Sequence, residues 1–317
     1  MARSREAALS LLVGGALVLS AAAPGAAEAA PRALRPGDSG PAVRRLQVRV
    51  AGWYPKSNRR VHFPLDGVYG RQTRAAVAAF QSRYGIAADG VAGRATMRVI
   101  ARLTDDNGST AHFDWSEFTQ NRNPACSAQA NAYAGTFGGG RVAARRAKRN
   151  VRRLMWRLEA VRARGRRPVG VNSGFRSVPY NDCIGGARAS QHLFGTAADN
   201  RMAAVSNHRE RRFARRSQFH GIGCYASLAH NHFDVRLDNR DLPGSRFWWW
   251  PERDRKGRDL DESGKPCWGE RKRRSGGRAD PAAVRAAVGG AGSLVPSVVE
   301  VRAFAAAGEP DRLGAPD

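Results

Sequence analysis

The chain has 317 residues and 42% of them are hydrophobic, so it can build the cores of two ordinary domains and is too long for a disulfide-held mini-protein. Lysine and arginine number 53 against 27 aspartate and glutamate residues, a formal net charge of +26. Such a charge argues against an average cytosolic enzyme and favours polyanionic surroundings, which are either nucleic acid or an anionic cell wall.

Residues 1–29 have the pattern of a secretory signal peptide. Arg3 and Arg5 precede an apolar run that begins at Ala7 and ends in the small-residue stretch 27–29. A retained membrane anchor is the alternative, but it needs roughly 20 unbroken apolar residues, and glycines interrupt this run. We therefore predict export, which favours the cell wall over nucleic acid. An exported nucleic-acid-binding protein remains an interpretation that rests on charge alone.

Residues 34–103 predict a compact unit of three helices. An Asp-Gly-Val-x-Gly turn stands at 66–70 and again at 89–93, each time just before a predicted helix. A Gly-rich and Pro-containing turn precedes the first helix. That helix presents one apolar face, made by Val43, Leu46 and Val50. The recurrence of turn and helix indicates an internal repeat.

These turns carry a family resemblance. Gly37-Asp38-x-Gly40-x-x-Val43-x-x-Leu46-Gln47, Asp66-Gly67-x-Tyr69-Gly70-x-x-Thr73 and Asp89-Gly90-x-x-Gly93-x-x-Thr96 resemble the peptidoglycan-binding domain of bacterial wall hydrolases. Backbone needs also explain the pattern, because glycine permits a positive φ and aspartate, or Thr73, can cap the following helix. The resemblance implies peptidoglycan as a partner. We expect this domain to fold alone and to concentrate the enzyme on the wall without affecting its chemistry.

Residues 104–112 are polar and turn-prone and predict a linker to a second domain at 113–270. There we expect a long helix at 141–164. Its core-facing stripe consists of Val151, Leu154, Met155, Leu158 and Val161. Because 12 Lys or Arg residues and one Glu lie between 141 and 167, its opposite face is cationic. We interpret that face as solvated, with attraction to anionic wall polymers as the alternative. Residues 271–317 predict a disordered basic tail.

Four cysteines lie in the second domain: Cys126, Cys183, Cys224 and Cys267. An even number of cysteines in an exported chain favours disulfides over metal-bound thiolates, and no Cys-x-x-Cys spacing argues otherwise. Four cysteines allow three pairings, and the sequence alone does not select one. Sequential pairing is preferred, Cys126 with Cys183 and Cys224 with Cys267.

The residues that carry chemistry fall in two short motifs, 190–199 and 230–235. His192 and Asp199 are seven residues apart with a glycine between them, so a loop entering a strand can bring both to one metal ion. His230 and His232 share one face of a strand, so one can bind the metal while the other works beside it. Three protein ligands with an open position suit a hydrolytic zinc site. The other histidines are interpreted as structural: His62, His112, His208 and His220.

Together with Ser173-Gly174-Phe175-Arg176-Ser177 and Gly221-Ile222-Gly223-Cys224-Tyr225, these motifs resemble the zinc D-Ala-D-Ala carboxypeptidase family. The resemblance spans roughly 113–237. It implies one zinc ion per chain, bound by His192, Asp199 and His232. It also implies His230 as the catalytic histidine and Arg176 as the group that holds the substrate carboxylate or the polarised carbonyl. Ser190 and Asp234 are then expected to orient the ligands.

The sequence departs from the family pattern at two positions. Other members have a glutamate base three residues before the final histidine, where this chain has Ala229. Some have a further histidine five residues before it, where this chain has Ser227. Proton transfer is therefore left to His230 or to zinc-activated water alone.

We predict an all-α three-helix domain followed by an α+β domain with a small antiparallel sheet, in which 168–172 and 230–237 are central strands. The predicted function is that of a secreted, monomeric zinc D-alanyl-D-alanine carboxypeptidase acting on peptidoglycan stems, without a nucleic-acid partner. The alternatives are a cross-bridge endopeptidase of the same family and a non-catalytic, zinc-stabilised wall-binding protein.

Overall fold

The computed structural model describes residues 32–56, 62–121, 123–224, 229–239 and 241–242, and the backbone of 248–251. Apart from Arg32, these residues belong to one compact unit, Ala33–Asp317. The predicted signal peptide, the predicted tail and Cys267 lie outside the described residues. In the described part of the chain, no helix is long and apolar enough to cross a membrane.

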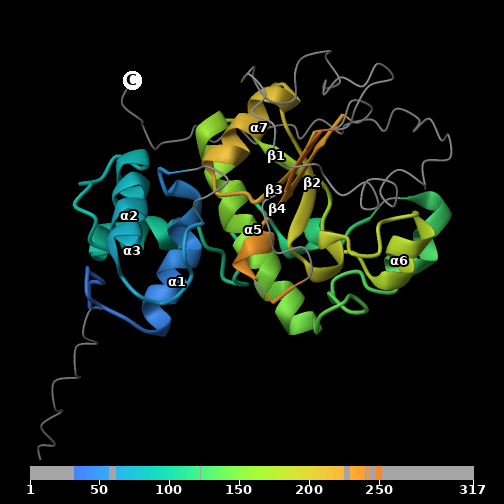
Figure 1. The fold of residues 1–317 in the computed structure, drawn as a ribbon, viewed down its shortest axis with the longest axis horizontal. Coiled ribbons are helices and arrows are strands. Elements are labelled where there is room, and N and C mark those ends of the chain that lie inside the picture. The colour runs from blue at the N-terminus through green and yellow to red at the C-terminus, as the bar shows by residue number, and fades with distance from the viewer. Residues whose placement is uncertain are drawn as a thin grey trace, which may run out of the picture. The chain divides into compact units, whose positions relative to one another are not determined.

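The N-terminal part of the unit is helical, as predicted. Its elements are α1 (Pro41–Val50), η1 (Ala51–Trp53), α2 (Arg71–Arg83) and α3 (Arg94–Arg102), coloured blue to cyan in Figure 1. The predicted apolar face of α1 is buried, with Val43 and Val50 at 0% exposure. It packs with Val77 and Phe80 of α2 and Ile100 of α3 in one hydrophobic cluster.

The internal repeat is reproduced in the hydrogen bonds. Gln47 Nε2 donates to Asp66 Oδ1 at 2.8 Å and to Thr73 Oγ1 at 3.1 Å, and its Oε1 accepts from the Gly67 amide at 2.8 Å. In the second copy the corresponding bonds measure 2.8, 2.9 and 2.8 Å and join Gln81 to Asp89, Thr96 and Gly90. Each buried glutamine therefore ties a helix to the turn that follows it.

The aspartates of the turns do not cap helices, so that expectation is wrong. Asp66 Oδ1 accepts from the Val68 amide at 2.9 Å, which closes the turn itself. Gly70 is the N-cap of α2, without a side-chain cap bond, and Thr73 lies inside the helix. The carboxylate is already engaged by the turn and by the glutamine, and so it does not reach the helix end.

The sheet contains β1 (Val169–Ser173), β2 (Ala197–Met202), β3 (Gly221–Cys224), β4 (Asn231–Asp234) and β5 (Trp248–Pro251). The strand order is β1-β2-β4-β3-β5; the first four strands are antiparallel to their neighbours and β5 runs parallel to β3. The predicted α+β class with a small antiparallel sheet is confirmed. Two details differ: β1 is an edge strand, because β2 rather than β1 pairs with β4, and β5 adds a parallel strand.

The remaining helices surround this sheet. α5 (Ala144–Gly165) packs against β2 and against α7 (Asn207–Arg216), as Figure 1 shows. The short elements are η2 (Trp115–Phe118), η3 (Pro124–Cys126), α4 (Ser127–Asn131), α6 (Val178–Cys183), η4 (Gln191–Phe194) and η5 (Arg236–Asp238). Cys126 and Cys183 form a disulfide that joins η3 to the end of α6, as predicted. Cys224 is also disulfide-bonded, and its predicted partner lies outside the described residues.

Helix α5 serves two cores. Its predicted stripe, including Leu154 and Leu158, is buried under the sheet. On another face, Trp156 and Ala160 belong to the core of the N-terminal helices. Gly52 of η1 lies so close to α5 that a Cβ on this glycine would be 2.6 Å from the Cβ of Ala160. The face opposite the predicted stripe is therefore not simply solvated, and the expectation of an independently folding repeat is not supported.

The predicted linker is packed rather than extended. Ser109 and Thr110 are 0% exposed. His112 Nδ1 hydrogen-bonds to Glu159 Oε2 of α5 at 2.9 Å. The segment therefore joins the two cores as an ordered turn, and the domain limits at 103 and 113 stay a prediction.

Candidate metal centre

Three predicted ligands meet at the centre of the sheet. Asp199 on β2 lies directly opposite His232 on β4 in the strand register. His192 comes from η4, the short helix that leads into β2. Their donor atoms all lie within 4.8 Å of one another, and all three residues are buried. Two adjacent strands and the loop before one of them thus bring together residues that are up to 40 positions apart.

The spacing of the donor atoms fits a tetrahedral zinc ion. His192 Nε2 is 3.2 Å from His232 Nδ1 and 3.3 Å from Asp199 Oδ1, and the third distance, His232 Nδ1 to Asp199 Oδ1, is 3.1 Å. Ligands about 2.0–2.1 Å from a tetrahedral zinc ion stand about 3.3 Å apart. Two imidazole nitrogens and one carboxylate oxygen therefore form one face of such a tetrahedron.

Both histidines are oriented through their second nitrogen. His192 Nδ1 donates to the Gly174 carbonyl oxygen at 2.5 Å. His232 Nε2 lies 3.2 Å from Asp234 Oδ2, and Asp234 is held in turn by the Nε of Arg236 at 2.8 Å. Such partners fix the tautomer and direct the remaining lone pair at a metal.

The electrostatics favour the protonation states that zinc requires at His192 and Asp199. Burial lowers the pKa of His192 to about 4, so its ring is neutral at pH 7. Burial alone would raise the pKa of Asp199, but His192, His232 and Arg176 hold it well below its usual range. The pKa of His232 is raised instead: burial lowers it, but the hydrogen bonds and negative charges of Asp199 and Asp234 outweigh that effect. A neutral His192 beside an ionised Asp199 is ready to bind a divalent cation, whereas His232 gives up its Nδ1 proton when it binds one.

Arg176 stands beside these ligands. Its Nη2 donates to Asp199 Oδ2 at 2.6 Å and its Nε donates to Ser173 Oγ at 2.9 Å. The side chain is 14% exposed. A guanidinium group has five N–H donors, and three of those of Arg176 have no hydrogen-bond partner among the described residues.

His230 directly precedes β4 and is partly exposed. Burial lowers its pKa; Asp199 opposes this, and Arg176 and His232 add to it. The ring is therefore neutral at pH 7 and able to accept a proton. Ala229 is exposed, and Ser227 lies outside the described residues.

Ser190 does not play a visible part in orienting the ligands. It is the N-cap residue of η4 without a side-chain cap bond, and no hydrogen bond in the described part of the chain joins its hydroxyl to a ligand. The Gly174 carbonyl and Arg236 support the ligands instead, and sequence reasoning missed both. Arg236 could have been found from the sequence, because it stands two residues after Asp234, close enough for an ion pair. The Gly174 carbonyl could not, because every residue has a main-chain carbonyl.

The buried nitrogen and oxygen donors, with an arginine and a neutral histidine beside them, define a hydrolytic metal centre of the metallopeptidase class, next to a helical repeat. Residues 125–234 match the model of the peptidase M15 family, and residues 39–100 match that of a putative peptidoglycan binding domain. A zinc D-Ala-D-Ala carboxypeptidase of Streptomyces albus G is 41% identical over 230 residues, which cover 69% of this chain and 78% of that protein. The chain belongs to the peptidase M15 family, and it is a zinc metallopeptidase.

Proposed function

We propose that this chain is an exported zinc D-alanyl-D-alanine carboxypeptidase that acts on the peptide stems of peptidoglycan. The observation that carries the proposal is the buried group of His192, Asp199 and His232 at 3.1–3.3 Å, with Arg176 on its rim. The relative from Streptomyces albus G supports the substrate class. The match to a peptidoglycan-binding domain supports the wall as the place of action.

In this proposal, His192, Asp199 and His232 hold one zinc ion per chain. When bound, zinc supplies Lewis acidity for the activation of water and of the scissile carbonyl. Asp234 keeps the Nε2 proton of His232 in place, which leaves the Nδ1 lone pair for the metal. Ser190 remains a proposed orienting residue through its backbone position at the start of η4.

Arg176 binds the substrate. Its free N–H donors suit the planar carboxylate of a terminal D-alanine or the oxygen of the scissile carbonyl. His230, neutral at pH 7, accepts a proton during attack and returns it to the departing amine. Two observations support these roles: Arg176 donates to Asp199, and His230 lies close enough to Asp199, Arg176 and His232 for their charges to shift its pKa.

We further propose that residues 1–29 direct export, that the protein acts as a monomer, and that its basic surface adds attraction to anionic wall polymers. In the proposed organisation, residues 34–103 bind the wall and residues 113–270 carry the peptidase. A net charge of +26 supports the attraction to polyanions.

The alternatives differ in their products. A carboxypeptidase releases free D-alanine from a stem, whereas a cross-bridge endopeptidase lowers the number of cross-linked dimers without releasing D-alanine. A non-catalytic zinc protein does neither. Mass spectrometry of purified wall fragments after incubation with the enzyme separates the three.

The two neighbouring histidines test the roles. His232→Ala removes a metal ligand, so zinc content and activity should fall together. His230→Ala should keep near-stoichiometric zinc while turnover of a D-Ala-D-Ala peptide falls by roughly 10²-fold, the scale of a lost general acid or base. If His230→Ala loses zinc as completely as His232→Ala, then His230 is a ligand; full activity in His230→Ala would assign the proton transfers to another group.

A further inference from the structure

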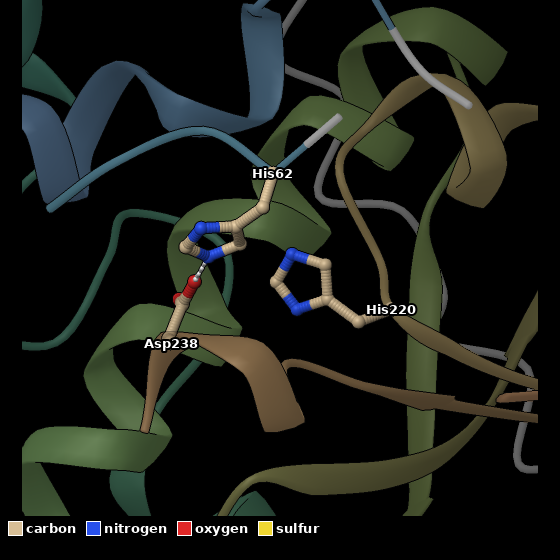
Figure 2. A group of neighbouring side chains, drawn as sticks. All are labelled: His62, His220 and Asp238. Atoms are coloured by element: carbon tan, nitrogen blue, oxygen red, sulfur yellow. Dashed lines mark hydrogen bonds and ion pairs between the residues drawn. The ribbon is translucent and has the colours of Figure 1, made fainter. Parts of the chain in front are cut away.

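A second group of polar side chains is buried where the helical repeat meets the peptidase. His62 precedes α2, His220 precedes β3 and Asp238 ends η5; Figure 2 shows the three side chains facing one another. His62 Nε2 lies 3.2 Å from Asp238 Oδ1. The side chain of Asp238 is 0% exposed and that of His62 is 13% exposed. We call this group the His62 cluster.

The donor atoms of the His62 cluster are close enough for a metal ion, since they lie within 4.8 Å of one another. Their other partners argue against one. Arg157 Nη2, from α5, lies 3.0 and 3.1 Å from the two oxygens of Asp238, and the Arg157 side chain is 0% exposed. The Leu237 amide donates to His220 Nδ1 at 3.3 Å, which leaves the ring proton on Nε2. Arg157 thus engages both carboxylate oxygens of Asp238, whereas Arg176 contacts only Oδ2 of Asp199 and Oδ1 faces His232. We therefore interpret the His62 cluster as an ion-pair network.

This network is connected to the proposed zinc site through η5. That element has three residues, with Arg236 at its start and Asp238 at its end. Arg236 donates from Nε to Asp234 Oδ1 at 2.8 Å and from Nη2 to Asp234 Oδ2 at 2.5 Å. Asp234 Oδ2 is the partner of His232 Nε2. The three residues of η5 therefore connect Asp238, the partner of His62, to Asp234, which orients the proposed ligand His232.

Side chains rather than its own hydrogen bonds hold η5 in place, because a single 3-10 turn makes few internal bonds. Arg153 Nη1 donates to the Asp238 carbonyl at 3.0 Å and to Asn239 Oδ1 at 2.8 Å. Arg157 and His62 hold the Asp238 carboxylate. Of these anchors, His62 is supplied by the helical repeat.

We propose that His62 is a positioning residue for the metal centre: by fixing Asp238 it holds η5, and through Arg236 and Asp234 it keeps His232 aimed at zinc. The helical repeat is then part of the support of the catalytic site as well as a wall-binding unit. This inference rests on the proposed function, in which His232 binds zinc.

The test uses the full secreted chain and three variants. His62→Ala removes the contact, and His62→Gln restores a donor at the place of Nε2. His112→Ala is the matched control, because His112 Nδ1 also pairs with a buried carboxylate, Glu159 of α5, at 2.9 Å. Among the described residues, no hydrogen bond or ion pair joins His112 to η5. Each protein is assayed for zinc retention against a chelator, for kcat and KM on a short soluble D-Ala-D-Ala peptide, and for thermal stability.

Loss of an outer partner of a metal ligand usually weakens metal affinity or activity about 10–100-fold. Because His62 acts through Asp238 and Arg236, we expect the low end: His62→Ala should bind zinc roughly tenfold more weakly and lose kcat with little change in KM. His62→Gln should recover most of both. His112→Ala should keep wild-type zinc affinity even where it lowers thermal stability.

Three results would overturn the inference. The first is zinc affinity and kcat in His62→Ala within twofold of wild type. The second is an equal loss of zinc in His112→Ala, which would reduce the effect to general stability. The third is two zinc ions per wild-type chain with one lost in His62→Ala, which would make the cluster a metal site. A wild-type protein that retains zinc but releases no D-alanine would instead refute the proposed function, and the zinc-retention comparison would still test His62.

Discussion

Gly221 offers a sharp test of how the metal centre is supported. It lies on β3 directly opposite Asp234 on β4. A Cβ at this position would lie 1.8 Å from Asp234 Oδ2 and 2.3 Å from its Cγ. Non-bonded carbon atoms normally approach only to about 3.5 Å, so in Gly221→Ala the carboxylate carbon, 2.3 Å from the new Cβ, has to move by about 1.2 Å. The substitution therefore displaces Asp234 without replacing any of the three proposed zinc ligands.

The displacement should weaken zinc binding. Asp234 Oδ2 lies 3.2 Å from His232 Nε2, and a shift of that size breaks the contact. We expect a loss of zinc affinity of about 10–100-fold, which corresponds to about 1.4–2.7 kcal/mol. The buried pair of Asp234 and Arg236 is disturbed too, so thermal stability should also fall.

Gly170→Ala is the matched control. Gly170 lies on β1 of the same sheet, and the nearest atom to a Cβ there, the Arg201 carbonyl oxygen, is 4.0 Å away. Both variants are titrated with a chelator at pH 7 and followed by zinc content and D-alanine release. Wild-type zinc affinity in a folded Gly221→Ala protein would refute the argument that Asp234 is needed to orient His232.

Two further predictions concern stability. Removing the disulfide by replacing Cys126 and Cys183 with serine should lower the free energy of unfolding by about 4 kcal/mol, because the bridge closes a loop of 57 residues; urea unfolding measures this, and a change below about 1 kcal/mol would contradict it. Burial lowers the pKa of His220 to about 3, so from pH 6.5 down to 3 only the unfolded chain takes up this proton. As the pH is lowered through that window, the free energy of unfolding should decrease in wild type by up to about 1.4 kcal/mol per pH unit more than in His220→Asn. Equal slopes of unfolding free energy against pH in the two proteins, measured by urea unfolding, would contradict this prediction.

The sequence predicted which residues meet at the proposed zinc site better than it predicted the groups that support them. His192, Asp199 and His232 carry a local signal, because a short loop and the alternation of a strand place them predictably once β2 and β4 are neighbours. Their partners include the Gly174 carbonyl, and a main-chain oxygen has no signature in the sequence. The aspartates of the repeated turns show a similar limit of sequence-based prediction. Helix capping and turn closure use the same residue types, so the sequence did not show that Asp66 closes its own turn.

The shared core was harder to foresee, although its residues are visible in the sequence. Trp156 and Ala160 are four positions apart and form a second apolar stripe on α5. The surrounding arginines led to the interpretation of a solvated face. Arg157 is nevertheless 0% exposed, because Asp238 neutralises it. A charge count does not show which cations are buried, since each requires a partner that lies far away in the sequence.

This shared core changes the expected effect of the helical repeat on catalysis. A tethered binding domain raises the local concentration of the enzyme and leaves hydrolysis of a soluble peptide unchanged. Here, removing residues 34–103 would expose Trp156, which is now 2% exposed, and would leave Asp238 without His62. Activity on a soluble peptide should therefore fall together with wall binding.

A double-mutant cycle at Gly52 tests this point without deleting a domain. The Cβ added by Gly52→Ala would lie 2.6 Å from the Cβ of Ala160 and 3.4 Å from the Trp156 carbonyl oxygen. Such overpacking lowers stability by about 1–3 kcal/mol. Ala160→Gly alone weakens α5 by about 1 kcal/mol, but it also removes the clashing atom. The double variant should therefore be more stable than the sum of the single effects by at least about 1 kcal/mol. We also expect zinc affinity to fall in Gly52→Ala, because α5 carries Arg157, which holds Asp238 of η5, and to recover in the double variant. Strictly additive losses of stability would show that the repeat and α5 do not share a core in solution.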